Sequence, residues 1–343
     1  MGNSDSFDLA TNKYEAINYA QVKERLENYG VCYIPNILTD EERIEMISGT
    51  WDFFEHLTQN DDVPIRRENS ETWKYITSCT PINDMLFHYW NAGHSQHSWN
   101  IRQNPNVVSV FAELWNCAIN DLLVSFDGFG FLLPPENTNE GWQGNTERYH
   151  LDQSLYRTHF DGVQGFVTAY DIDDGDATLA FLEGSNNYMN EFIEKFGIIS
   201  ETDWVPFEKE HIDFFKSKCL ETRMKCPSKS LVLWDSRTVH CGSKPLKNRS
   251  NNNTRCISYV SYSPKNRITD QKLKEKIISF EALYTSNHYA HNPIYFPTLP
   301  NGHDGTTVEY VVPINPPILT NLGRSLVGYV DTSSDTISSD SIN

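Results

Sequence analysis

The residues best suited to catalytic chemistry are two histidines and one aspartate, in the segments RYHLDQS and WDSRTVHCG. His150 and Asp152 are separated by one residue, so on an extended segment both side chains point to the same face. His240, on a second segment, would complete a set of two imidazoles and one carboxylate. Such a set leaves three adjacent positions open on a six-coordinate ion, as in non-haem Fe(II) oxygenases, whereas zinc is more often held tetrahedrally.

Two alternatives stay open on spacing alone. The chain has 11 histidines, so a His-x-Asp pair is also compatible with an ordinary surface or turn position. A second such pair, His159 and Asp161, stands directly before an expected strand and leaves no separate strand to carry ligands. The simplest interpretation of this second pair is a turn that ends at Gly162. Spacing therefore favours His150 and Asp152 as ligands.

The elements that must position these residues are mostly short strands. Apolar segments predict strands at about 122–135, 163–171, 177–185, 230–235, 238–242 and 255–262. Many short strands separated by turns are typical of a sandwich or jelly roll. Helices are expected at 14–28, at 105–116, at 271–283 and after Thr39, whose capping-box partner is Glu42. The predicted fold class is mainly β with helical decoration, that is, α+β.

The chain is expected to form one domain with two tails. The domain spans residues 14–310 and carries a helical insertion at about 188–218. Residues 1–13 are expected to be a mobile tail, and residues 311–343 a second tail that ends in the low-complexity segment DTSSDTISSDSIN. Gly2 begins a match to the myristoylation pattern, and acylation there would give weak, reversible membrane association. The alternative is an unmodified tail.

Composition limits the partners. The 28 Lys and Arg residues against 46 Asp and Glu residues give a net charge of −18, which opposes binding to a nucleic-acid backbone. No segment approaches the roughly 18 consecutive apolar residues of a transmembrane helix. The seven cysteines are odd in number and lack close pairing, so reduced thiols in a cytoplasmic setting are expected. A small-molecule substrate fits these limits.

Four segments in order resemble the phytanoyl-CoA dioxygenase family of Fe(II)/2-oxoglutarate oxygenases: YGVCYIPNILTDEE, YHLDQS, VQGFVTAYDIDDGDATLAFLEGSN and LVLWDSRTVHCG. The resemblance runs from about residue 22 to about residue 265. It departs from the family at residues 182–186, where a turn of the "PGSH" kind lacks both its proline and its histidine. Neither of these is a metal ligand, so the departure concerns the turn.

The resemblance implies a double-stranded β-helix, or cupin-like jelly roll, and a dioxygenase activity. Fe(II) would be held by His150, Asp152 and His240, with 2-oxoglutarate and O2 as co-substrates and succinate and CO2 as products. The expected reaction is hydroxylation of a C–H bond. Related halogenases replace the ligand carboxylate by a small residue to admit halide, and Asp152 is present here.

The resemblance also implies an arginine for the far carboxylate of 2-oxoglutarate, on the strand that follows the distal histidine. Arg249 lies in the polar segment KNRSNNNT and is expected to face solvent. Arg255 opens an apolar strand, where a guanidinium is costly to bury without an anionic partner, so it is the predicted residue. Further expected co-substrate contacts are Ser258, Gln164 and Thr168, and expected substrate contacts are Trp99, Arg102 and Gln153.

Two rival functions remain. One is a catalytically inert double-stranded β-helix that binds a ligand or a protein. The other is a cupin-like metal enzyme that does not use 2-oxoglutarate. The joint presence of the two histidines, the aspartate and the arginine favours the dioxygenase over both.

Overall fold

Two facing antiparallel sheets form the centre of the molecule. The computed structural model describes residues 12–139, 141, 148–300 and 313–330. The larger sheet has the order β1 (Val31–Ile34), β10 (Leu231–Asp235), β6 (Val163–Thr168), β12 (Arg255–Pro264), β4 (Phe129–Leu132) and β2 (Leu86–Phe87), and β3 (Leu122–Val124) also pairs with β12. The smaller sheet has the order β8 (Val205–Pro206), β5 (His150–Leu151), β11 (His240–Ser243), β7 (Thr178–Leu182) and β9 (Glu221–Arg223).

The path of the chain confirms the predicted fold class. The chain crosses between the sheets from β5 to β6, from β6 to β7, from β10 to β11 and from β11 to β12. All strand pairs within the sheets are antiparallel. This alternation between two stacked antiparallel sheets is the double-stranded β-helix, a form of jelly roll.

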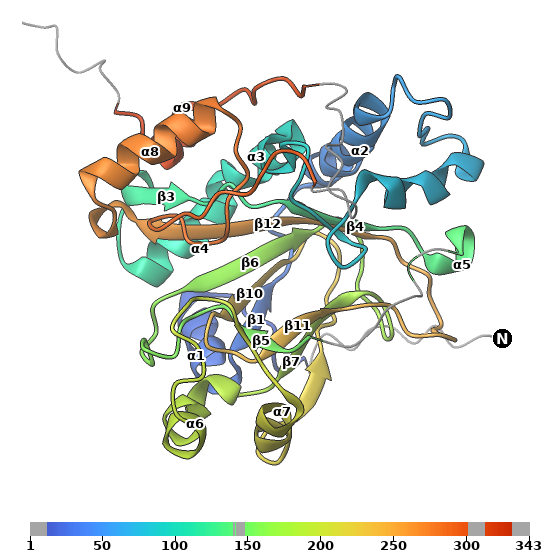
Figure 1. Cartoon of the computed structure of the whole chain (residues 1–343). Helices are drawn as coiled ribbons and strands as arrows, with labels where there is room; N and C mark the ends of the chain where they lie inside the picture. Colours follow the sequence, from blue (N-terminus) through green and yellow to red (C-terminus); the bar gives the residue numbers. More distant parts are fainter. Residues whose placement is uncertain (1–11, 140, 142–147, 301–312, 331–343) are drawn as a thin grey trace, which may run out of the picture.

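Helices cover the outer faces of both sheets (Figure 1). The helices are α1 (Tyr19–Tyr29), α2 (Asp40–Leu57), α3 (Gln96–Arg102), α4 (Pro105–Trp115), α5 (Pro135–Thr138), α6 (Met189–Phe196), α7 (Lys209–Lys216), α8 (Asp270–Glu281) and α9 (Asn321–Val327). Short 3₁₀ helices lie at Ser70–Cys79, Ala92–His94, Ile119–Asp121, Ser185–Tyr188 and Lys265–Arg267. In Figure 1, α2, α3, α8 and α9 lie above the larger sheet, and α6 and α7 lie below the smaller one.

Side chains alternate between an inner and an outer core, as the period of two of a strand requires. On β10, Val232 and Trp234 pack between the sheets with Phe166, whereas Leu231 and Leu233 pack under the helices of the larger sheet. Another cluster joins β5, β7 and β11 to α6 and α7. The direction of each strand residue therefore tells which side chains face the space between the sheets.

Local signals explain where several elements begin. The capping box of Thr39 and Glu42 is present at the start of α2, as predicted. The helix expected from residue 14 begins only at Tyr19, because the backbone of Tyr14 and Ala16 bonds to that of Tyr33 on β1. The single strand expected at 122–135 is divided into β3 and β4 by residues 125–128.

The segment expected to be a C-terminal tail contains an ordered helix. Leu326 and Val327 of α9 are fully buried in the outer core, and Thr320 caps the helix through the amide of Gly323. The apolar side chains of α9 explain why this segment is ordered and not a tail, because the helix packs against β3 and the 3₁₀ helix before it. Gly2 and the low-complexity end lie outside the described residues. In the described part of the chain, no helix combines the length and the apolar character needed to cross a membrane.

Candidate metal centre

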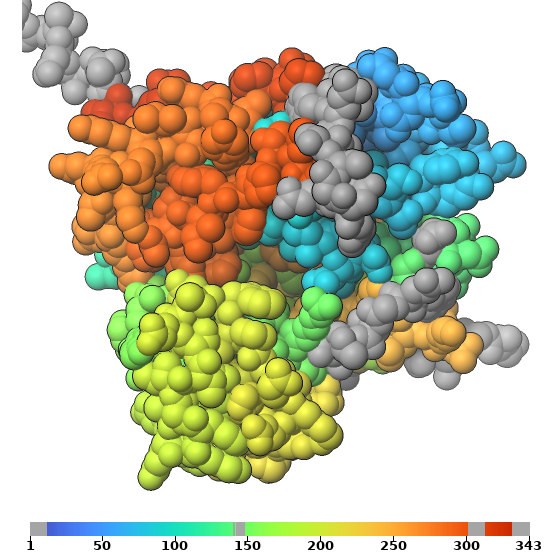
Figure 2. Space-filling model, in the orientation of Figure 1, coloured from blue at the N-terminus to red at the C-terminus, as the bar shows by residue number. Residues whose placement is uncertain are grey.

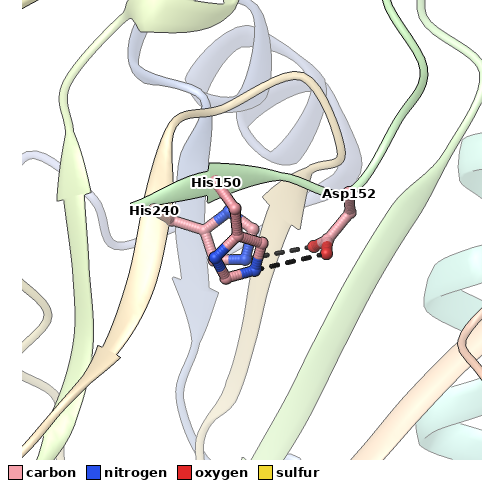
Figure 3. A group of neighbouring side chains, drawn as sticks. All are labelled: His150, Asp152 and His240. Carbon is pink, nitrogen blue, oxygen red and sulfur yellow. Dashed lines mark ion pairs between the residues drawn. The ribbon is translucent and has the colours of Figure 1, made fainter. Parts of the chain in front are cut away.

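Three side chains from the two strands β5 and β11 and the turn after β5 converge between the sheets (Figure 3). His150 and His240 are direct partners in the register of β5 and β11, and their ring centroids are 4.5 Å apart. The Nε2 of His240 lies 3.0 Å from Oδ2 of Asp152, and the Nε2 of His150 lies 3.5 Å from Oδ1. The candidate ligand atoms all lie within 4.8 Å of one another. The structure therefore brings together the three residues that spacing favoured.

Backbone carbonyls set the tautomer of both histidines. The Nδ1 of His150 lies 2.8 Å from the carbonyl oxygen of Arg148, and the Nδ1 of His240 lies 2.8 Å from that of Thr238. A carbonyl oxygen only accepts, so each Nδ1 carries a hydrogen and donates it. Each Nε2 is then the ring nitrogen that faces Asp152, and it is the atom through which the neutral form of each histidine would ligate a metal.

The Asp152 carboxylate is oriented by donors from the larger sheet. The amide of Gln164 donates to Oδ2 at 2.5 Å, and the indole N–H of Trp234 donates to the same oxygen at 3.1 Å. Gln164 and Trp234 face each other in the register of β6 and β10. The predicted co-substrate contact Gln164 thus lies beside the site, but its amide is used to hold Asp152.

The electrostatics of the site favour a cation beside Asp152. Burial alone would raise the pKa of the Asp152 carboxyl, but the charges of His240 and His288 hold this pKa well below its usual range. Burial alone would lower the pKa of His150, yet the hydrogen bond and charge of Asp152 raise it above its usual value. Two imidazole lone pairs and one carboxylate in a buried space are stabilised by a shared positive charge.

The second His-x-Asp pair takes no part in this cluster. His159 is exposed, and its carbonyl oxygen accepts from the side chain of Gln153. Asp161 pairs instead with Arg157 and Arg267. The structure thus gives this pair a role in a turn, which was the simpler of its two interpretations.

Arg255 lies between the sheets on the same side as the triad. It belongs to the inward-facing residues of β12, with Ile257 and Tyr259, and its guanidinium lies 5.4 Å above the ring of Phe166. The side chain donates to the carbonyl of Ala177 and the hydroxyl of Tyr259, both at 3.3 Å. Its Nε is buried without a partner, and no carboxylate of the described residues pairs with it. A buried guanidinium in this state is suited to binding an anion.

Arg249 differs from the expectation that it faces solvent. Its side chain is 1% exposed and pairs with Glu136 and Asp176, at 2.8 and 2.7 Å. These two carboxylates offset the cost of burial, so Arg249 has its anionic partners already. Sequence could not show this, because Glu136 is more than a hundred residues away.

Two other predicted co-substrate contacts, Ser258 and Thr168, lie on opposite faces of the larger sheet. Ser258 lies between Cys256 and Val260 on the outward face of β12, under the helices. Thr168 faces inward with Phe166, but its hydroxyl donates to the carbonyl of Tyr170. Gln164 and Thr168 are an even number of residues apart on β6, so their side chains point the same way. Ser258 is an odd number of residues from Arg255 on β12, so its side chain points the opposite way.

The predicted substrate contacts are corrected by the structure. Trp99 and Arg102 are completely buried on α3, in the outer core beyond the larger sheet. Arg102 donates to the backbone carbonyls of Gly93 and Asp127, and Trp99 packs against Phe280. Gln153 is also buried, and its amide holds the turn at residues 157–159. The aromatic and basic residues of α3, Trp99 and Arg102, are thus packing residues.

Several residues of the site were not predicted. Trp234 is buried in the core between the sheets and also orients Asp152. The ring of Trp204 lies beside that of His150 in a tilted arrangement, with ring centroids 5.7 Å apart, and its amide donates to the Asp152 carbonyl at 3.2 Å. The hydroxyl of Tyr289 donates to that same carbonyl, also at 3.2 Å. The inward parity of Trp234 on β10 was a usable signal, whereas nothing in the segment around Trp204 connects it to residue 150.

A separate cavity of about 250 Å³ lies among the helices, away from this centre. It is lined by residues of α2, α3 and the start of α9, including Met46, His97, Gln103 and Thr320. None of its lining residues belongs to the triad or contacts Arg255. The chemistry therefore does not coincide with this cavity.

Comparison with known proteins supports the fold. No protein-family model matches the chain. "Ava biosynthesis cluster protein O" of Aspergillus versicolor is 29% identical over 215 residues, which are 60% of this chain. The match spans 66% of that relative, slightly under two thirds of its length.

Solved structures are similar at low identity. GlcNAc Inducible Gene 2 from Candida albicans is 14% identical with a TM-score of 0.53, over 76% of this chain and 67% of that one. The epimerase SnoN, in complex with Fe3+, alpha ketoglutarate and nogalamycin RO, is 12% identical with a TM-score of 0.46, over 89% and 96% of the two chains. At 14% identity and a TM-score of 0.53, GlcNAc Inducible Gene 2 shows a shared fold and nothing more.

Proposed function

We propose that this chain is a non-haem Fe(II)- and 2-oxoglutarate-dependent dioxygenase, similar to phytanoyl-CoA dioxygenase, that hydroxylates a C–H bond of a small molecule. One observation carries the proposal. The Nε2 atoms of His150 and His240 converge on Asp152, and an inward-facing arginine without a carboxylate partner lies between the same sheets.

The ligand set fits Fe(II). Two neutral imidazoles and one carboxylate form the facial set that leaves open positions for O2 and for a chelating co-substrate. No cysteine takes part, and none of the seven cysteines forms a disulfide. Gln164 and Trp234 keep Asp152 in place, as outer partners of metal ligands do. Free thiols also suit the reducing, cytoplasmic setting that we expect.

Arg255 fits the far carboxylate of 2-oxoglutarate. On β6, Gln164 contacts Asp152, and Phe166, two residues further, lies under the Arg255 guanidinium. Two residues of strand correspond to about 7 Å, so a short dicarboxylate can run from the metal toward the arginine. The guanidinium and the Tyr259 hydroxyl would bind its distal carboxylate, and the co-substrate would supply the anion that the site lacks.

The residues of the chain then have separate tasks. His150, Asp152 and His240 hold the ion, and Arg255 orients the co-substrate. The walls of Phe166, Trp234 and Ile257 keep water from the inner end of the site. When bound, Fe(II) would supply activation of O2 coupled to decarboxylation of 2-oxoglutarate, which yields succinate and CO2. The curated relative carries the name of a biosynthesis cluster, which supports a small-molecule substrate.

An anaerobic titration tests the proposal. Fe(II) and 2-oxoglutarate added to the folded protein should give a weak visible charge-transfer band, and oxygen should then yield succinate. His150→Ala should abolish the band. His159→Ala is the matched control, because it removes the exposed histidine of the other pair, and it should leave the band unchanged. A folded protein with neither band nor succinate would refute the assignment.

A further inference from the structure

Among the tryptophans that the structure describes, Trp204 alone is exposed to solvent, and it lies next to the candidate metal ligands. Half of its surface, 50%, is accessible, whereas the other described tryptophans are buried or partly buried. An indole normally buries its large apolar surface, so exposure at this position leaves a favourable contact unused. Its ring lies beside that of His150, with centroids 5.7 Å apart and planes inclined by 42°.

The strand register shows which face of the smaller sheet carries His150. Val205 on β8 packs away from the space between the sheets with its register partner Leu151. Side chains alternate along a strand, so Pro206 points to the opposite face. Pro206 is the register partner of His150, whose side chain faces Asp152. The contact between the rings of Trp204 and His150 places the indole beside that face.

The open side of the metal centre is also the side of Trp204. The side chains of Asp152 and His240 are 6% and 5% exposed, whereas that of His150 is 17% exposed. A molecule that reaches the ion from solvent must pass the most accessible ligand. Trp204 flanks that approach. In Figure 2, the segment 188–218 that contains it, coloured yellow-green, forms the lower front surface of the molecule.

The backbone at Trp204 is strained and firmly held. Its φ is +62°, in the left-handed region that bulky residues rarely adopt. The amide of Trp204 donates to the Asp152 carbonyl at 3.2 Å. The preceding Asp203 accepts from the backbone amide of Ser154 at 2.9 Å and pairs with Arg157 at 2.5 Å. Strain kept in place by several contacts, on an exposed indole beside an active centre, is typical of a functional position.

We infer that Trp204 is the platform on which the substrate lies, and that the substrate presents a flat aromatic or conjugated face to the indole. This inference rests on the proposed function, and it adds the class of substrate. A rigid indole binds a flat ring by stacking and loses little conformational entropy on doing so. The stacked molecule would have its reacting carbon at the open side of the ion, near His150. Trp204 is thus a substrate-positioning residue.

The test uses indole as a flat probe and cyclohexanol as a non-planar control. Saturation-transfer NMR measures the binding of each to the full chain in the presence of Zn(II) and 2-oxoglutarate. Indole should bind more tightly than cyclohexanol. Trp204→Ala should weaken indole binding at least about 10-fold, and Trp204→Phe should restore most of it. Tyr19→Ala removes another partly exposed aromatic ring, far along the chain on α1, and should change nothing.

Two further readouts separate the possible failures. The Fe(II)–2-oxoglutarate band is read separately from the binding of indole, so absence of the band from the wild type would refute the dioxygenase assignment and not the platform. Trp204→Gly should have a melting temperature equal to or above that of the wild type, because glycine relieves the positive φ. Equal binding of indole by wild type and Trp204→Ala, equal binding of indole and cyclohexanol, or a large loss of melting temperature would each overturn the inference.

Discussion

The indole N–H of Trp234 donates to Oδ2 of Asp152 at 3.1 Å and joins the two sheets at the metal centre. Trp234 belongs to β10 of the larger sheet, whereas Asp152 follows β5 of the smaller one. The indole is buried, so the bond is made in a medium in which losing it would be costly. The position of the candidate ligand carboxylate therefore depends on how the two sheets are stacked.

Trp234→Phe is expected to weaken Fe(II) binding by about 10- to 100-fold, the usual cost of removing an outer partner of a metal ligand. Phenylalanine keeps most of the apolar volume but removes the donor. Fe(II) titration under anaerobic conditions measures the change. Trp115→Phe is the matched control. The indole N–H of Trp115, at the end of α4, also donates a hydrogen bond, at 2.8 Å to the carbonyl oxygen of Tyr262 on β12. Equal affinity in both variants would contradict the role of Trp234.

How much of the candidate site could be predicted from the sequence depended on how far apart in the chain the interacting residues lie. The candidate ligands could be named from sequence because His150 and Asp152 are close in the chain and the family resemblance adds His240. The burial of Arg249 and the bond of Trp234 to Asp152 were not predicted, because their partners are distant in the chain and are set by strand register and loop packing. Sequence periodicity shows which face a side chain occupies, but not which residue it meets there.

The same distinction explains the helical segments. Residues around Trp99 and Arg102 are rich in polar and aromatic types, which suggested a pocket wall. The structure buries them because α3 packs its whole length against α2 and β12. Polar types in a buried helix are compatible with the core when backbone carbonyls accept their hydrogens, as they do for Arg102.

Arg255→Met should raise the 2-oxoglutarate concentration required for the charge-transfer band by about 10- to 100-fold, since hydrogen bonds to charged groups contribute about 1.5–3 kcal/mol. Its stability should change little, because the loss of two hydrogen bonds of 3.3 Å is offset by no longer burying a charge without a carboxylate partner. Band titration and thermal unfolding measure the two effects. Unchanged co-substrate affinity would exclude Arg255 as the carboxylate partner.

Arg249→Met should show the opposite behaviour. It leaves the buried carboxylate of Asp176 without its cation, so a loss of about 3 kcal/mol in unfolding free energy is expected. The affinity of the folded variant for 2-oxoglutarate should equal that of the wild type. Urea unfolding and the same band titration check this. A weaker affinity for 2-oxoglutarate, with stability unchanged, would reverse the assignment of the two arginines.

Arg102→Met should unfold the protein more easily without affecting catalysis by the folded fraction. The guanidinium is completely buried and donates to the carbonyls of Gly93 and Asp127, which would lose their donor. Each unsatisfied buried carbonyl costs about 1–3 kcal/mol. Denaturant unfolding measures the loss. A variant with normal stability but a changed requirement for substrate would restore the substrate-contact interpretation that the structure removes.

His94 and His97 should make the fold sensitive to mild acid. Burial, with the charge of Arg102, lowers the pKa of each imidazole to about 3, so both are neutral in the folded protein. The unfolded chain binds protons at these histidines below their ordinary pKa of about 6.5, whereas the folded chain does not until about pH 3. Stability is therefore full above about pH 6.5 and falls as the pH decreases toward 3.

The expected loss is about 2 kcal/mol for each histidine at pH 5, because each pH unit below the ordinary pKa costs about 1.4 kcal/mol. Urea unfolding between pH 7.5 and 5 measures the slope. His97→Gln should remove about half of the pH dependence that His94 and His97 contribute together, since the His97 ring takes up a proton only on unfolding. His56→Gln is the control, because it changes a histidine on the last turn of α2 that is not buried. A slope in His97→Gln equal to that of the wild type would show that the buried imidazole is not the group that takes up the proton on unfolding.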